Sequence, residues 1–394
     1  MDDAIEADTS GVGTDAWRNW RVWRLGAPEL ENYDDELQSD AAFVGGPVIF
    51  GPYQLSSVIR WPRSFGTALI VTGGIHTDLT RDVVVDGKLA EPDSSAYHGG
   101  TMTHEVASLV SLELGVRLRV AGTRRLSGFH RAGESDDPMH FDVPRLADPS
   151  ASSSREVLPQ VVNRPADLGS LRLLDSFPSI AEPDQAELVR AARSYAASLW
   201  WANEDPNLAW LQLVTAVEAA ATRRQSTKPD SMDLVKEYWP ELAEMLGSTD
   251  AATKKIAARL AQQTRAGRKF QDFLVECAPF PPTPRPTSTL DWEPAGLRAC
   301  ARIIYAHRSK ALHEGKPFPM PMLEPPRVES SGAIAEVPEG LGASGLGGSW
   351  LAVNTPMYLA TFEHIARGAL LKWWEELATA AAPDVPLAPE VSST

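Results

Sequence analysis

The chain has 394 residues, 43% of them hydrophobic, which suits a globular protein of two or three domains. No run approaches the roughly 20 apolar residues that cross a bilayer, and the acidic start at residues 1–6 lacks the basic and apolar regions of a signal peptide. We therefore expect a cytoplasmic protein that does not enter the membrane, and the net charge of -15 argues against a surface that binds nucleic acid all over.

Residues 1–165 alternate short apolar runs with Gly, Pro and Asp. The runs at 42–50, 67–72 and 82–87 predict strands separated by turns. Residues 104–115 predict either a helix that ends at Gly115 or a segment that runs into a strand at 116–120. We expect a mixed α/β domain over residues 1–165, with a linker or exposed loop at 148–156.

From about residue 182 the apolar side chains follow the period of a helix. The stretch from Pro206 to Arg224 is apolar nearly all round, which predicts a central, buried helix. In each pair of neighbouring tryptophans, at 200–201 and 373–374, we expect one ring to lie in the core. Helices are predicted at 183–203, 206–224, 231–246, 251–265, 268–277, from 294 through Arg308, and at 356–379.

Loops separate these helices. Five prolines between Pro279 and Pro286 predict one, and the Gly-rich residues 332–348 predict a flexible one. The expected fold class is α+β, with the mixed α/β domain followed by an all-α helical bundle over residues 166–394.

Several sequence patterns resemble known functional motifs but predict no binding or catalytic site. Residues 340–345 fit GxGxxG, but more Gly and Ser follow where a dinucleotide site needs a helix. The two cysteines, Cys277 and Cys300, form no CxxC, so we expect neither a disulfide framework nor a Cys-based zinc site, and we predict no cofactor. His104, His130 and His140 are expected to be ordinary surface or loop residues.

Basic residues gather locally on this acidic chain. Residues 254–270 hold six basic residues and no acid, and residues 294–316 hold five against Glu314. Such a patch can concentrate a polyanion at one place, although a solvated helix face is the plainer interpretation of the first run. The candidates for binding a polyanion are Lys254, Lys255, Arg259, Arg268 and Lys269.

Arg308 and His313 lie near the end of a predicted helix, just before Gly315 and Pro317. Five residues turn a straight helix by about 500°, which leaves the two side chains about 140° apart. They converge only if the helix loosens near Gly315 or if two subunits share the site. Glu218 lies on the apolar helix, and because burying an unpaired carboxylate is costly, we expect it to contact Arg308 or a neighbouring donor.

The stretch from Tyr305 to Gly315, YAHRSKALHEG, resembles the Arg-x4–6-His signature of HEPN domains, and most closely their ApeA-like branch. Glu218 in the segment AVEA resembles the upstream helix of that branch, and the likeness covers about residues 180–380. Ser309 stands where many catalytic HEPN domains have Asn, Asp or His. The resemblance implies a metal-independent ribonuclease in which Arg308 and His313 are catalytic and Glu218, Ser309, His307 and Lys310 support them.

Such an enzyme would cut RNA by attack of the 2′-hydroxyl on the adjacent phosphate. A histidine can move the proton near neutral pH, and a guanidinium can hold the phosphate oxygens. One His per chain supplies only one of two proton roles, so we expect a homodimer through the helical domain. The resemblance implies a prokaryotic anti-phage toxin whose first domain senses an unknown ligand or protein trigger. The alternative is a non-catalytic module that dimerises or binds a partner.

Overall fold

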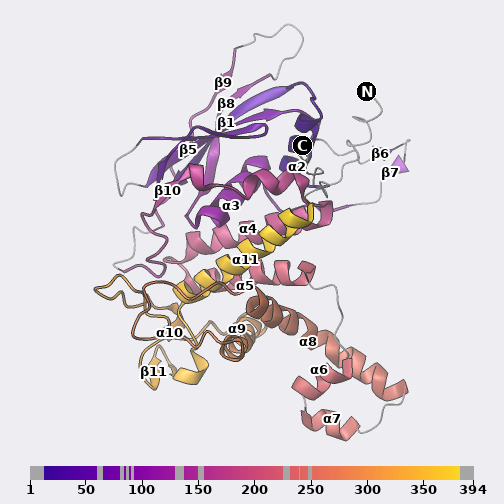
Figure 1. The fold of residues 1–394 in the computed structure, drawn as a ribbon, viewed down its shortest axis with the longest axis vertical. Helices are drawn as coiled ribbons and strands as arrows, with labels where there is room; N and C mark the ends of the chain where they lie inside the picture. The colour runs from indigo at the N-terminus through magenta and orange to yellow at the C-terminus, as the bar shows by residue number, and fades with distance from the viewer. Residues whose placement is uncertain are drawn as a thin grey trace, which may run out of the picture.

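The computed structural model shows a β-sheet at one end of the molecule, with helices packed in successive layers beneath it (Figure 1). Helices α6 and α7 lie at the far end of the long helix α8, which extends away from the body (Figure 1). The structure describes residues 13–59, 65–79, 84–85, 88–89, 93–128, 137–149, 155–224, 231–238, 240–246 and 251–381.

The sheet has six antiparallel strands in the order β3-β4-β5-β1-β8-β9. Its middle strand β1 was not predicted, because its sequence, ENYDDELQS, lacks the alternation of apolar and polar residues. The strands are β1 (Glu31–Ser39), β3 (Val48–Phe50), β4 (Tyr53–Ser57), β5 (Gly66–Ile75), β8 (Arg119–Ser127) and β9 (Met139–His140).

Shorter pairs surround the sheet. The predicted run at 42–50 divides into β2 and β3, and β2 pairs in parallel with β10 far along the chain. Part of the predicted run at 82–87 forms β6, which pairs with β7. The bounds are β2 (Ala42–Val44), β6 (Val84–Val85), β7 (Lys88–Leu89) and β10 (Pro165–Asp167).

Two helices lie against the sheet. α2 (Asp15–Arg24), which was not predicted, inserts Trp17 and Trp20 into the core. α3 (Met102–Leu114) ends at Gly115, which has a left-handed conformation with φ of 66°. The first of the two predictions for residues 104–115 is therefore confirmed, and the strand begins only at Arg119.

The second half of the chain forms the helical layers. Residues 251–277 form one continuous helix, so the predicted break between 265 and 268 is wrong. The predicted helix at 231–246 is two helices, and the last helix begins at Leu359 rather than 356. The bounds are α4 (Glu182–Trp201), α5 (Pro206–Arg224), α6 (Ser231–Tyr238), α7 (Pro240–Leu246), α8 (Ala251–Cys277), α9 (Pro294–Glu314), α10 (Met320–Leu323) and α11 (Leu359–Ala381), with the 3-10 turns η1 (Leu168–Ser170), η2 (Leu174–Ser179) and η3 (Ala352–Asn354).

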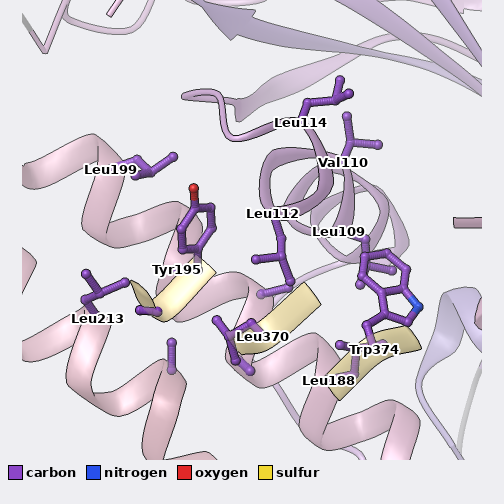
Figure 2. Packing of buried hydrophobic residues seen from close by; sticks show 14 of the residues in the cluster. Leu109, Val110, Leu112, Leu114, Leu188, Tyr195, Leu199, Leu213, Leu370 and Trp374 are labelled. Atoms are coloured by element: carbon purple, nitrogen blue, oxygen red, sulfur yellow. The ribbon is translucent and has the colours of Figure 1, made fainter. Parts of the chain in front are cut away.

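One buried cluster runs from the sheet through α3 into the helical layers. Figure 2 shows Leu112 of α3, Tyr195 of α4 and Leu370 of α11 in this shared core. Trp200 is buried while Trp201 is partly exposed, as expected, but Trp373 and Trp374 are both buried. The expected core ring of the second pair is therefore confirmed, and the other ring is buried as well because α11 has neighbours on both sides, among them α5, α8 and η2.

The structure agrees with the predicted loops to different degrees. The proline-rich residues 279–286 carry no helix or strand, as expected. The Gly-rich segment contains a hairpin of β11 (Gly342–Gly345) and β12 (Gly348–Leu351), so the GxGxxG match leads into a β-turn and not into a helix. Of the expected linker at 148–156, residues 150–154 lie outside the described residues.

Candidate functional site

Helix α9 carries the Arg308–His313 motif and stays regular to its end. Pro294 occupies its first turn, and Gly315 closes it with φ of 66°, its N–H donating to the Lys310 carbonyl. Lys316 N–H donates to the same carbonyl at 3.3 Å. The helix does not loosen before Gly315, so within one chain Arg308 and His313 point in different directions. The first of the two arrangements expected from the sequence, a helix that loosens near Gly315, is therefore wrong.

Glu218 and Arg308 join α5 to α9. Arg308 Nη2 donates to Glu218 Oε2 at 2.7 Å, which confirms the contact expected from the sequence. The Arg308 guanidinium also lies 5.7 Å from the centre of the Tyr305 ring, and Tyr305 hydrogen-bonds to Glu218. Both charged side chains are mostly buried, at 22% and 17% exposure. The guanidinium is thus held in one orientation at the surface of the bundle.

Helix α8 closes this cluster from a third side. A Cβ on Gly267 would lie 3.1 Å from two atoms of the Tyr305 ring, so the glycine lets the α8 backbone approach the tyrosine. Phe270, one turn further, packs against the same ring with 5.4 Å between ring centres. Tyr305 is therefore fixed by packing as well as by its hydrogen bond.

Burial raises the pKa of Glu218 above its ordinary value, despite the opposing effects of Arg308 and Tyr305. The Nε of Arg308 is buried without a hydrogen-bond partner. A guanidinium has five N–H donors, and Glu218 is bonded to one of them. The arrangement leaves Arg308 able to hold a second anion, such as a phosphate, while Glu218 orients it.

The other motif residues have separate environments. His307 Nε2 bonds to the Asn354 carbonyl at 2.8 Å, and burial lowers its pKa. Ser309 is partly buried, whereas Lys310 and His313 are exposed. His307 therefore serves to attach η3 to α9, and His313 is the histidine of this helix that solvent reaches freely.

The candidate polyanion-binding residues divide into two groups along α8. Lys254, Lys255 and Arg259 are exposed on its first half, where α6 packs. Arg268 pairs with Asp272 at 2.8 Å, and Lys269 donates to the Thr222 carbonyl at 3.3 Å. Arg268 and Lys269 therefore support the packing of α8, while the first three remain open to a polyanion.

The sequence missed a polar cluster at the start of α3. Asp35 of the unpredicted strand β1 is 6% exposed, and His104 lies between two cavities rather than in a loop. His104 thus lies on a helix and not in a loop, whereas His140 is exposed on β9 and His130 lies outside the described residues. An acidic residue inside β1 was the one available signal, because such residues are rare in strand interiors.

Comparison with protein-family models, curated proteins and solved structures gives no match. Among the described residues, no group of three or more His, Cys, Asp or Glu side chains is placed to hold a metal ion. None of the helices in the described part of the chain has the length and apolar character needed to span a membrane.

Proposed function

We propose that this protein is a metal-independent endoribonuclease of the HEPN type that forms its active site between two copies of the chain. The observation that carries the proposal is the Glu218–Arg308 bond, which holds a guanidinium at the bundle surface on the helix that also presents His313. We place Arg308 and His313 in the catalytic machinery. Arg308 would bind the phosphate, and His313 would transfer protons.

The chemistry follows from these two groups. Arg308 would bind the non-bridging phosphate oxygens and stabilise the charge that builds up as the 2′-hydroxyl attacks. A neutral His313 would accept the hydroxyl proton, and the protonated His313 of the second copy would donate a proton to the departing 5′-oxygen. A twofold axis supplies both histidines from identical chains. The 5′ product would carry a 2′,3′-cyclic phosphate.

The test is RNA cleavage in EDTA by wild type, Arg308→Ala and His313→Ala. Each substitution should reduce the cleavage rate by about 10²-fold or more, and a substrate with 2′-deoxyribose at the cut site should resist the wild type. Arg302→Ala is the matched control, because Arg302 is an exposed arginine on the same helix. It should cut at the wild-type rate.

Equal cleavage by wild type and both variants, or cleavage by none of them, would reject the nuclease. The second result, together with a dimer in sedimentation that Glu218→Ala weakens, would instead favour a non-catalytic interaction module. In that case the Glu218–Arg308 pair serves only to join α5 to α9.

A prokaryotic anti-phage role is part of the proposal. It predicts that expression of wild type, but not of Arg308→Ala or His313→Ala, arrests growth of a bacterial host once the protein is active.

A further inference from the structure

An open cavity of about 460 Å³ lies on the face of the sheet that is turned away from the helical layers. Gln54 of β4 and Thr72 of β5 line it, and along their strands they alternate with residues of the core. The end of α2 contributes Trp23, and the segment that leads into β1 contributes Glu29. No residue of the proposed nuclease site lines this cavity, so it is a separate place in the molecule.

Gly74 of β5 is the point where two polar groups of the cavity converge. A Cβ on Gly74 would lie 2.7 Å from Glu29 Oε2 and 2.9 Å from His76 Nε2. Gly74 does not have a positive φ, so its backbone conformation is open to any residue. The glycine therefore provides space, because it lets a carboxylate oxygen and an imidazole nitrogen come close to one spot.

Both of these atoms are hydrogen-bond acceptors. His76 Nδ1 bonds to the Ala27 carbonyl at 2.9 Å, and because a carbonyl only accepts, Nδ1 carries the proton and Nε2 of the neutral ring has a lone pair. Glu29 Oε1 accepts from Asn32 Nδ2 at 2.9 Å. Among the described residues, none donates a hydrogen bond to Glu29 Oε2 or to His76 Nε2. Two acceptors facing one spot suit a ligand atom that carries at least two N–H or O–H protons.

The charges around the cavity favour a cation. Arg125 also lines it, but its Nε and Nη2 both donate to the Asp34 carboxylate, at 2.6 and 3.3 Å. The charges of Arg125 and Asp34 therefore balance each other. No cation in the described part of the chain forms an ion pair with Glu29. The site is thus left with one negative charge, on a chain whose net charge is -15.

The opposite side of the cavity is apolar. Trp23 is 39% exposed and Ile49 is 69% exposed, and both line the cavity together with Pro52. An aromatic ring attracts a cation that lies near its face, and an aliphatic chain can pack against such side chains. The cavity therefore combines an acidic, acceptor-rich end with an apolar wall.

From these contacts we infer that the cavity binds a primary alkylammonium cation, the group that ends a diamine, a polyamine or a lysine side chain. The ammonium would donate to Glu29 Oε2 and His76 Nε2, and its third N–H would face solvent. The aliphatic chain would lie against Trp23 and Ile49. A hydroxyl has one proton and no charge, so it would satisfy only one of the two acceptors. Cavities of this size hold small ligands.

This inference goes beyond the nuclease and does not depend on it. The experiment is titration calorimetry of the full chain at an ionic strength of about 0.15 M, which screens general attraction to an acidic protein. Pentylamine should bind saturably at one site, whereas 1-pentanol, the neutral molecule with the same chain, should not bind. Cadaverine, spermidine and N-acetyl-lysine amide then distinguish the source of the ammonium. Tighter binding of the first two indicates a free polyamine, and tighter binding of the third indicates a lysine side chain.

Two substitutions test the acceptors. Glu29→Gln removes the charge and should weaken pentylamine by about tenfold or more. Gly74→Ala pushes Glu29 and His76 away from their common spot and should weaken it by a similar factor. Glu31→Gln is the matched control, because it removes the same charge two residues further along and Glu31 does not line the cavity. It should bind like wild type.

Absence of saturable pentylamine binding overturns the inference, as does equal binding of 1-pentanol. Equal weakening by Glu29→Gln and Glu31→Gln would also overturn it, because binding would then follow only the overall charge. Should Gly74→Ala fail to fold by circular dichroism, Trp23→Ala replaces it, since this partly exposed ring forms the apolar wall. Wild-type binding by the folded variant would equally overturn the inference.

Discussion

At the scale of single residues, Glu218 is the side chain on which the proposed site depends. Burial favours its neutral form, while Arg308 and Tyr305 favour the carboxylate, and the net result is a raised pKa. The folded protein therefore holds the Glu218 proton more tightly than the unfolded chain does. The stability linked to this proton is complete below the ordinary glutamate pKa and is lost as pH rises through the folded value.

Glu218→Ala should lower the free energy of unfolding by about 1–3 kcal/mol at pH 7, because it leaves the Arg308 guanidinium partly buried without its partner. Glu218→Gln keeps an acceptor and removes the charge, so it should cost less. Relative to wild type, the Gln variant should gain stability between pH 4.5 and pH 7. Urea unfolding at both pH values measures this difference. A Gln variant whose free energy of unfolding falls relative to that of wild type as pH rises would contradict the raised pKa of Glu218.

At the scale of elements, α11 is held against the segment that follows α8. His364 Nε2 bonds to the Phe280 carbonyl at 2.9 Å, and Gly368, one turn further along α11, faces Pro279. A Cβ on Gly368 would come within 2.5 Å of the proline ring. The glycine weakens the helix on its own but allows this close approach, so packing rather than helix propensity decides the residue here.

Gly368→Ala should therefore lower stability, although alanine favours a helix by about 1 kcal/mol over glycine. Overpacking a rigid ring costs about 1–3 kcal/mol, so the expected net loss is about 1 kcal/mol. Thermal unfolding compares the substitution in wild type and in Pro279→Gly, which removes the ring. Without the ring, Gly368→Ala should be neutral or stabilising, and an equal loss in both backgrounds would show that the contact is not responsible.

At the scale of the whole molecule, the sheet and the helical layers share one core. Arg367 of α11 reinforces the connection, because its Nε donates to the Leu112 carbonyl at 2.9 Å and its Nη2 to the Glu113 carbonyl at 2.5 Å. These carbonyls end helix α3, where acceptors have no partner within the helix. The first 165 residues thus depend on the rest of the chain to cover α3.

A fragment of residues 1–165 should not fold on its own. It would expose the face of α3 that carries Leu109 and Leu112, and each such leucine contributes about 1.5–3 kcal/mol when buried. The fragment should bind a hydrophobic dye and unfold without a cooperative transition, whereas the full chain should unfold in one. A fragment with a sharp melting transition would show that residues 1–165 form an independent domain after all.

The sequence by itself determined the features that depend on neighbours along the chain. The helices that start at Pro206 and Pro294, the end of α3 at Gly115 and the proline-rich loop all follow from local backbone preferences. The Glu218–Arg308 contact was also expected, because a carboxylate on an apolar helix needs a donor and Arg308 was one of the donors proposed for it.

Only the tertiary structure decided what depends on distant segments. Strand β1 has a polar sequence and becomes the middle of the sheet because β5 and β8 pair with both of its edges. Glu29 and His76 are separated widely in sequence, and the pairing of β1 with β5 brings them together beside Gly74. Arg308 and His313, in contrast, remain apart on a straight α9, because a regular helix fixes their directions whatever chemistry the motif suggests.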